Sequence, residues 1–106
     1  MQLYGKLVRD RIPELIEDQG KIPVIRILRH DDEYRECLQQ KLREEVDEYI
    51  ASGEIEELAD VFEVILALLD IEGRTIAELE QARIRKRRER GGFDGRLYLI
   101  GVQDRE

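Results

Sequence analysis

Regularly spaced apolar residues, separated by glycines and capping residues, organise this chain and predict four helices. The predicted helices cover about residues 13–19, 31–51, 54–72 and 75–90. Pro13 suits the first turn of the first helix, where a missing N–H is tolerated. The sequence from Thr75 to Glu78 matches a capping box at the start of the fourth. A glycine follows each helix, at a position where glycine terminates helices readily.

Two short segments outside these helices are rich in β-branched residues, which are typical of strands. Residues 22–28 and 96–102 are therefore expected to pair as a small two-stranded β element. The expected fold class is mainly α, an antiparallel helical hairpin or bundle of about four helices with this β element beside it. No internal repeat or low-complexity linker divides the chain, so we expect a single domain over residues 1–106.

Glu45 falls in the middle of the apolar stripe of the second predicted helix. On a helical projection it lies within about 20° of Leu38, while Glu48 flanks the stripe and Glu44 lies further round. The third predicted helix is apolar on most of its circumference, which is typical of a helix enclosed by neighbours or by a second subunit. We therefore expect a homo-oligomer, either a dimer or a tetramer.

A short break at residues 52–53 makes the second and third predicted helices antiparallel neighbours. The end of one helix then faces the start of the next, which brings five carboxylates together: Glu44, Glu45, Glu48, Glu57 and Asp60. Carboxylates on partly apolar surface do not all stay ionised unless a cation compensates their charge. Oxygen ligands without His or Cys suit Mg²⁺, with Mn²⁺ as an alternative. The competing interpretation is a solvated acidic surface that pairs with Lys41 and Arg43.

The charged residues of this chain are unevenly distributed along the sequence. The net charge is −7, which argues against binding of duplex nucleic acid. Residues 31–63 carry a balance of −10, whereas residues 83–96 carry +5. The single Cys37, the absence of an N-terminal apolar run and the shortness of every apolar stretch favour a cytoplasmic protein that does not bind membranes.

With these acidic motifs the sequence resembles the MazG-like superfamily of all-α nucleoside triphosphate pyrophosphohydrolases. Its E-E-x-x-E motif is Glu44-Glu45-Val-Asp-Glu48 here, and its E-x-x-D motif is Glu57-Leu-Ala-Asp60. The chain is most similar to the phosphoribosyl-ATP pyrophosphohydrolase-like branch, which shares the segments Tyr4 to Glu14 and Arg90-Gly-Gly-Phe93. Only eight residues separate the two acidic motifs, which is short for the superfamily, so Glu56 is an alternative to Glu57.

The resemblance implies Mg²⁺-dependent cleavage of a nucleoside triphosphate between its α and β phosphates, which releases a monophosphate and pyrophosphate. House-cleaning of non-canonical nucleotides is one role consistent with this chemistry. The implied metal ligands are Glu45, Glu48, Glu57 and Asp60. Either Glu44 or Glu45 would act on the attacking water. Two alternatives stay open: a non-catalytic nucleotide- or protein-binding helical module, and a hydrolase of another metabolite such as phosphoribosyl-ATP.

Basic side chains outside the acidic motifs are candidates for binding the substrate phosphates. Lys86 and Arg90 are four residues apart on one helical face and could neutralise the leaving pyrophosphate. Lys6 and Arg9 belong to the N-terminal segment that matches the family. Phe93 is a candidate for contact with the base. The alternative for most of these arginines is an ion pair with an acidic surface.

Overall fold

The computed structural model describes residues 1–105, and its regular secondary structure there is entirely helical. The helices are α1 (Ile12–Asp18), α2 (Asp31–Ser52), α3 (Ile55–Ile71) and α4 (Ile76–Arg90). The mainly α class is therefore confirmed, and each helix boundary lies within a residue or two of its prediction. The chain forms two compact units, Met1–Arg74 with α1 to α3 and Thr75–Glu106 with α4. A single domain over residues 1–106 stays a prediction.

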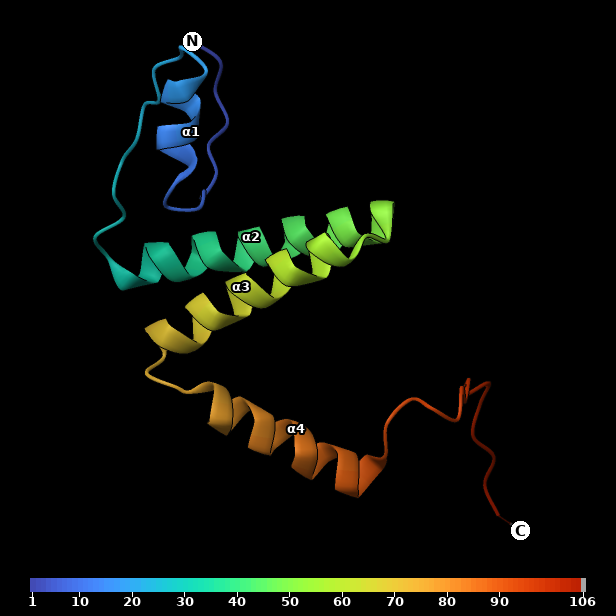
Figure 1. The fold of residues 1–106 in the computed structure, drawn as a ribbon. Coiled ribbons are helices and arrows are strands. Elements are labelled where there is room, and N and C mark those ends of the chain that lie inside the picture. Colours follow the sequence, from blue (N-terminus) through green and yellow to red (C-terminus); the bar gives the residue numbers. More distant parts are fainter. Residues whose placement is uncertain (106) are drawn as a thin grey trace. The chain divides into compact units, whose positions relative to one another are not determined.

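The α2–α3 hairpin is the centre of the first unit, and Figure 1 shows its two helices running antiparallel side by side. The turn depends on Gly53, whose φ of 69° is left-handed and therefore disfavours residues with a Cβ. The Gly53 N–H donates to the carbonyl of Tyr49 at 2.7 Å, and the Ser52 hydroxyl accepts from the N–H of Glu54 at 3.2 Å. These bonds close the last turn of α2 and start α3 in the opposite direction.

The core of this unit is small. Leu38 on α2 and Val64 on α3 are its buried apolar residues, and Glu45 is buried with them. Glu45 therefore lies within the apolar stripe of α2, as its helical position predicts. At the other end of the hairpin, Arg35 donates to Glu72 at 2.6 Å and connects α2 to the end of α3.

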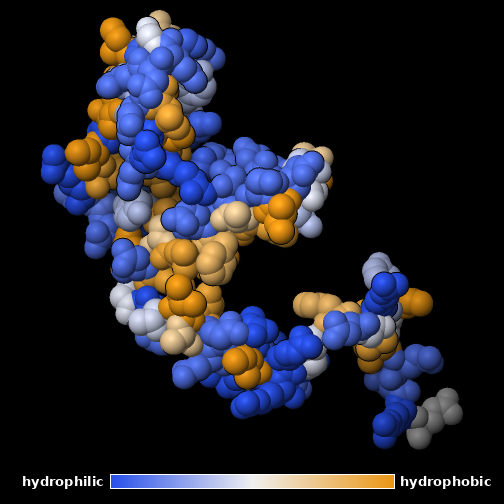
Figure 2. All heavy atoms as spheres, viewed as in Figure 1, coloured by the Kyte–Doolittle hydropathy of each residue, from blue (hydrophilic) through white to orange (hydrophobic). Residues whose placement is uncertain are grey.

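A second apolar face of α3 remains exposed. Leu58 and Phe62 keep 47% and 50% of their surface exposed, although Val64 on the other stripe is buried. Figure 2 shows hydrophobic side chains gathered over α3. Leu58 and Phe62, in the N-terminal half of one stripe, are thus more exposed than Val64 on the other stripe.

The expected two-stranded β element is wrong for the described residues. Residues 22–28 and 96–102 are irregular, and most of their large apolar side chains are exposed. One segment belongs to the first unit and the other to the second. β-Propensity mainly reflects packing on a half-buried sheet surface, and an isolated pair of short strands is marginally stable. Composition alone therefore overestimated strand formation here.

The second unit consists of α4 and the residues that follow it. The Thr75 hydroxyl accepts from the N–H of Glu78 at 3.1 Å, which confirms the predicted cap. Arg83 forms an ion pair with Glu80 one turn earlier on the same helix, and this contact lowers the pKa of Glu80. Across both units, none of the described helices combines the length and apolarity that a membrane-spanning helix needs.

Candidate metal centre

Four carboxylates from the α2–α3 hairpin converge on one point. Glu45 and Glu48 lie one turn apart on α2, and Glu57 and Asp60 lie one turn apart on α3. One carboxylate oxygen from each of the four lies within 4.8 Å of the others, so the group could hold a metal ion. These are the four residues that the acidic motifs predict as ligands.

Two oxygens of this carboxylate cluster are buried without a hydrogen-bond partner. They are Oε2 of Glu45 and Oε2 of Glu57. The Glu45 side chain is only 7% exposed, so water cannot fully solvate its charge. Unpartnered polar atoms in such surroundings are costly, and a cation at the cluster would satisfy them. The donor set and these orphan oxygens therefore fit a hard divalent cation.

Two basic side chains neutralise part of the cluster. Lys41 Nζ lies 3.1 Å from Oε1 of Glu45 and 3.5 Å from Oε2 of Glu44. Arg9 Nη2 lies 2.6 Å from Oδ1 of Asp60. One carboxylate of the cluster on α2 and another on α3 thus each have a basic partner.

Opposing effects act on the protonation of Glu45 and Lys41. Burial raises the pKa of Glu45, and the Glu48 carboxyl adds to this, whereas Lys41 opposes it; the net shift is upward. Burial would lower the pKa of Lys41, but its hydrogen bonds and attraction to Glu45 and Glu44 together outweigh burial and raise it. Lys41 therefore stays protonated beside Glu45, a carboxyl group whose ionisation is disfavoured by burial.

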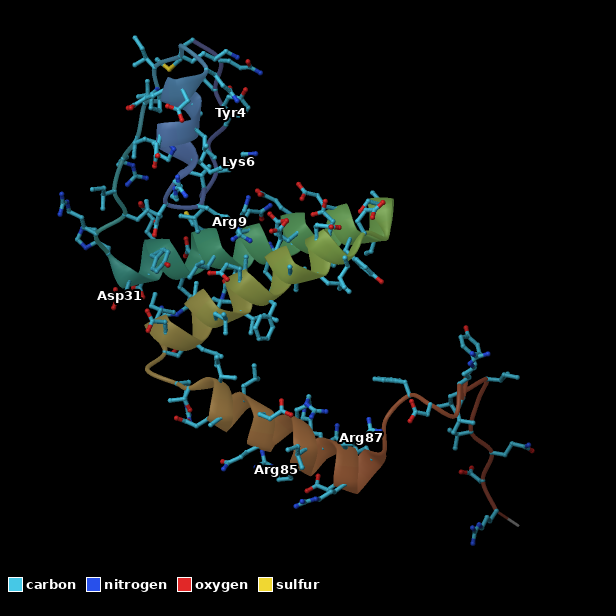
Figure 3. All side chains as sticks on the ribbon, viewed as in Figure 1. Tyr4, Lys6, Arg9, Asp31, Arg85 and Arg87 are labelled. Atoms are coloured by element: carbon cyan, nitrogen blue, oxygen red, sulfur yellow. The ribbon has the colours of Figure 1, made fainter. Side chains whose placement is uncertain are left out.

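A cavity of about 220 Å³ opens beside the cluster within the first unit. Figure 3 shows Lys6 and Arg9 on the N-terminal segment, with Arg9 directed toward the hairpin. The cavity is lined by Lys6, Val8, Arg9, Ile12, Lys41, Glu45 and Asp60. Three cations and two carboxylates of the cluster meet in this space, a combination that suits an anion bound together with a metal.

The other two acidic candidates, Glu56 and Glu44, lie outside the carboxylate cluster. Glu56 is exposed and lies outside the group that could hold a metal, whereas Glu57 belongs to it, so the short connection has not displaced the second motif. Glu44 also lies outside that group and contacts Lys41 instead. Glu44 thus contacts Lys41 without belonging to the cluster, whereas Glu45 contacts Lys41 and belongs to it.

The other candidates for phosphate or base contact belong to the second unit. Lys86 and Arg90 lie on α4, and Phe93 follows that helix with an exposed ring. Their participation in a site with the carboxylate cluster stays a prediction. Lys41, in contrast, was missed as a site residue because it was interpreted as a surface partner of nearby glutamates. Its position four residues before Glu45, on the face that carries the buried acid, was the available signal.

Comparison with known proteins leaves the family of this chain open. No family model matches it, and no solved structure does either. The chain is 60% identical over 48 residues to an uncharacterized protein of Mycolicibacterium smegmatis. That alignment covers 45% of this chain and 48% of the relative, so it spans about half the length of the protein it matches.

Proposed function

We propose that this protein is a Mg²⁺-dependent nucleoside triphosphate pyrophosphohydrolase of the MazG-like type. The observation that carries the proposal is the convergence of four carboxylates from an E-E-x-x-E and an E-x-x-D motif, with ligand oxygens within 4.8 Å. The buried, unpartnered oxygens of Glu45 and Glu57 support a cation at this point. The basic side chains around the adjacent cavity support an anionic substrate.

In this proposal Glu45, Glu48, Glu57 and Asp60 hold the metal. Mg²⁺ bound there supplies positive charge that polarises the α-phosphoryl group and lowers the pKa of the attacking water. Glu44 is the better candidate for orienting and deprotonating that water, because it lies outside the ligand group. Water adds to the α-phosphorus, the bond to the oxygen that bridges α and β breaks, and pyrophosphate leaves.

The cations of the proposed enzyme have different parts in this reaction. Lys6 and Arg9 line the cavity next to the cluster and are suited to phosphate oxygens of the substrate. Lys86 and Arg90 stay the predicted partners of the leaving pyrophosphate. Phe93 stays the predicted contact to the base. In the sequence these residues come from the N-terminal segment and from α4 and its C-terminal end.

We further propose that the enzyme is a homodimer or homotetramer. The support is the exposed apolar face of α3, where Leu58 and Phe62 remain about half exposed in the single chain. Apolar faces of this kind are typically covered in an assembly. The same apolar face of α3 in a second copy of the chain would cover these side chains.

The activity is tested with a panel of canonical and modified nucleoside triphosphates, together with phosphoribosyl-ATP, in the presence of Mg²⁺. We expect release of pyrophosphate that EDTA abolishes. Glu45→Gln and Asp60→Asn should each lower kcat by at least about a hundredfold, because each removes a charged ligand. Glu36→Gln, an exposed change on α2, is the matched control.

Three results would contradict the proposal. Orthophosphate in place of pyrophosphate would mean that a different bond is cleaved. Full turnover by both variants of the cluster would remove these carboxylates from the reaction. Nucleotide binding without turnover of any substrate in the panel would instead favour a non-catalytic module.

A further inference from the structure

We propose that Lys41 is a phosphate-binding residue that becomes available only when a divalent cation occupies the carboxylate cluster. In the metal-free protein it pairs with Glu45, and in the metal-loaded protein it turns to an anionic phosphate group in the adjacent cavity. The inference rests on the metal site of the proposed function. It adds a residue that the sequence motifs do not assign and a coupling between the two ligands.

The first support is the balance of charge around the cluster. Lys41 contacts Glu45 at 3.1 Å and Arg9 contacts Asp60 at 2.6 Å, and these acids lie on different helices. Together the two side chains carry the same charge as one divalent cation. Replacing them by the ion would leave these two carboxylates, one of them the buried Glu45, with the same compensating charge, so the metal-free arrangement is suited to an exchange of cations.

The second support is the surroundings of Lys41. Its side chain is 18% exposed and lines the same cavity of about 220 Å³ as Lys6 and Arg9. A lysine has a flexible stem and a compact ammonium group, so it can change partner by rotating within such a space without movement of the helix. A phosphate in the cavity would then meet three cations instead of an ammonium already paired with a carboxylate.

The exchange predicts that metal and phosphate bind cooperatively. Without metal, Lys41 and Arg9 are neutralised by acids, so an anion gains little from them. With metal, both are released, and phosphate affinity rises by the same factor by which phosphate raises metal affinity. A purely structural lysine, which only stabilises buried Glu45, has no such dependence.

The test measures binding rather than turnover, with Mn²⁺ and inorganic pyrophosphate as probes of the full-length protein. Mn²⁺ affinity is measured alone by electron paramagnetic resonance, and pyrophosphate affinity is measured calorimetrically at saturating Mn²⁺. In Lys41→Met we expect Mn²⁺ alone to bind at least about fivefold tighter, because a competing cation is gone. We expect pyrophosphate to bind at least about fivefold weaker, because a phosphate partner is gone. Effects of opposite sign from one substitution are the signature of exchange.

Arg43→Met is the matched control, since Arg43 is an exposed cation two residues further along α2 with only a 3.5 Å contact to Gln40. It should leave both affinities within about twofold, because exposed charges are screened. Lys41→Gln, which keeps a hydrogen-bonding side chain beside Glu45, replaces Lys41→Met if that variant does not fold. Circular dichroism identifies folded variants.

Two outcomes would overturn the exchange while leaving the metal site intact. One is unchanged or weaker Mn²⁺ binding in a folded Lys41 variant, and the other is tighter Mn²⁺ binding with unchanged pyrophosphate affinity. Absence of Mn²⁺ binding by the wild-type protein would overturn the metal site and the exchange together. The wild-type titration therefore distinguishes failure of the proposed function from failure of this inference.

Discussion

Arg9 Nη2 lies 2.6 Å from Oδ1 of Asp60, and the two residues are 51 positions apart in the chain. This ion pair connects the N-terminal segment to α3 at the carboxylate cluster. Arg9 is 55% exposed, so the pair contributes little to folding stability compared with a buried contact. Because Arg9 lies beside a carboxylate of the cluster, we expect it to act in binding more than in stability.

Replacing Arg9 by Met should therefore separate binding from stability. We expect the free energy of unfolding to change by no more than about 1 kcal/mol, because exposed pairs contribute about 0.2–1 kcal/mol. We expect KM for the best triphosphate to rise about tenfold, since a charge-assisted contact to phosphate is lost. Urea unfolding and steady-state kinetics measure the two effects. Arg11→Met, which removes a pair with nearby Glu14, is the control, and equal KM values for the two variants would contradict the assignment.

Glu45→Gln should uncouple metal binding from folding. In the wild-type protein, Mg²⁺ at a hundred times its Kd should stabilise the fold by about 2.7 kcal/mol. The variant should lose this gain while remaining at least as stable as the wild type in EDTA, because the buried charge is removed. Thermal unfolding with and without Mg²⁺ provides the measurement. A normal Mg²⁺-induced increase in Tm for the variant would exclude Glu45 as a ligand.

The raised pKa of Glu45 gives its contribution to stability a defined pH dependence. The folded metal-free protein holds the Glu45 proton more tightly than the unfolded chain does, because burial raises the pKa. The resulting stabilisation is fully present below the ordinary carboxyl pKa and is lost as pH rises through the raised value. Denaturant unfolding in EDTA between about pH 4 and 8 should show the wild type losing stability relative to Glu45→Gln. Parallel profiles for the two proteins would contradict this prediction.

The exposed face of α3 should control assembly. Phe62→Asp places a charge in the centre of that face, and we expect it to shift the protein to monomers because a buried unpaired charge strongly destabilises an interface. Sedimentation at micromolar concentration measures the change. Glu63→Gln, an exposed substitution at the next position, should leave the assembly unchanged. A compact wild-type monomer under these conditions would contradict the proposed oligomer.

Charge removal on α4 tests the predicted contacts to the leaving group. Combined Lys86→Met and Arg90→Met substitutions should lower kcat/KM by about a hundredfold, because both cations are predicted to bind the leaving pyrophosphate. Arg88→Met, on another side of the helix, should change kcat/KM by less than about threefold. Steady-state pyrophosphate release measures both. Similar losses in the two proteins would show a general effect of basic charge instead of a specific contact.

Helix positions and the convergence of the four carboxylates could be predicted from the sequence because both depend on local spacing. A two-residue break between helices forces an antiparallel hairpin, and three-residue spacing then places Glu45 with Glu48 and Glu57 with Asp60. Capping at Thr75 is equally local. The same reasoning identified Glu45 as a buried acid from its place on the apolar stripe.

Predictions that depended on distant contacts were less successful. The predicted pairing of residues 22–28 with residues 96–102 depends on a contact between segments far apart in the chain. β-Propensity contains no information on such contacts. Lys41 was missed for a different reason, because its contact with Glu45 is local, only four residues along α2. A lysine on a charged helix is usually solvated. The burial of Glu45 beside Lys41 is the observation that indicates a contact within the site. Arg9 was predicted from its segment, but its contact with Asp60 could not be derived from spacing.

The turn at Gly53 keeps the carboxylate cluster local in the chain. All four carboxylates of the cluster lie between residues 45 and 60, so assembling them requires closure of only a short loop. Contacts this local in sequence form early during folding, before distant segments have met. A cation bound at this cluster, as proposed, would therefore stabilise the helical hairpin before the N-terminal segment has docked.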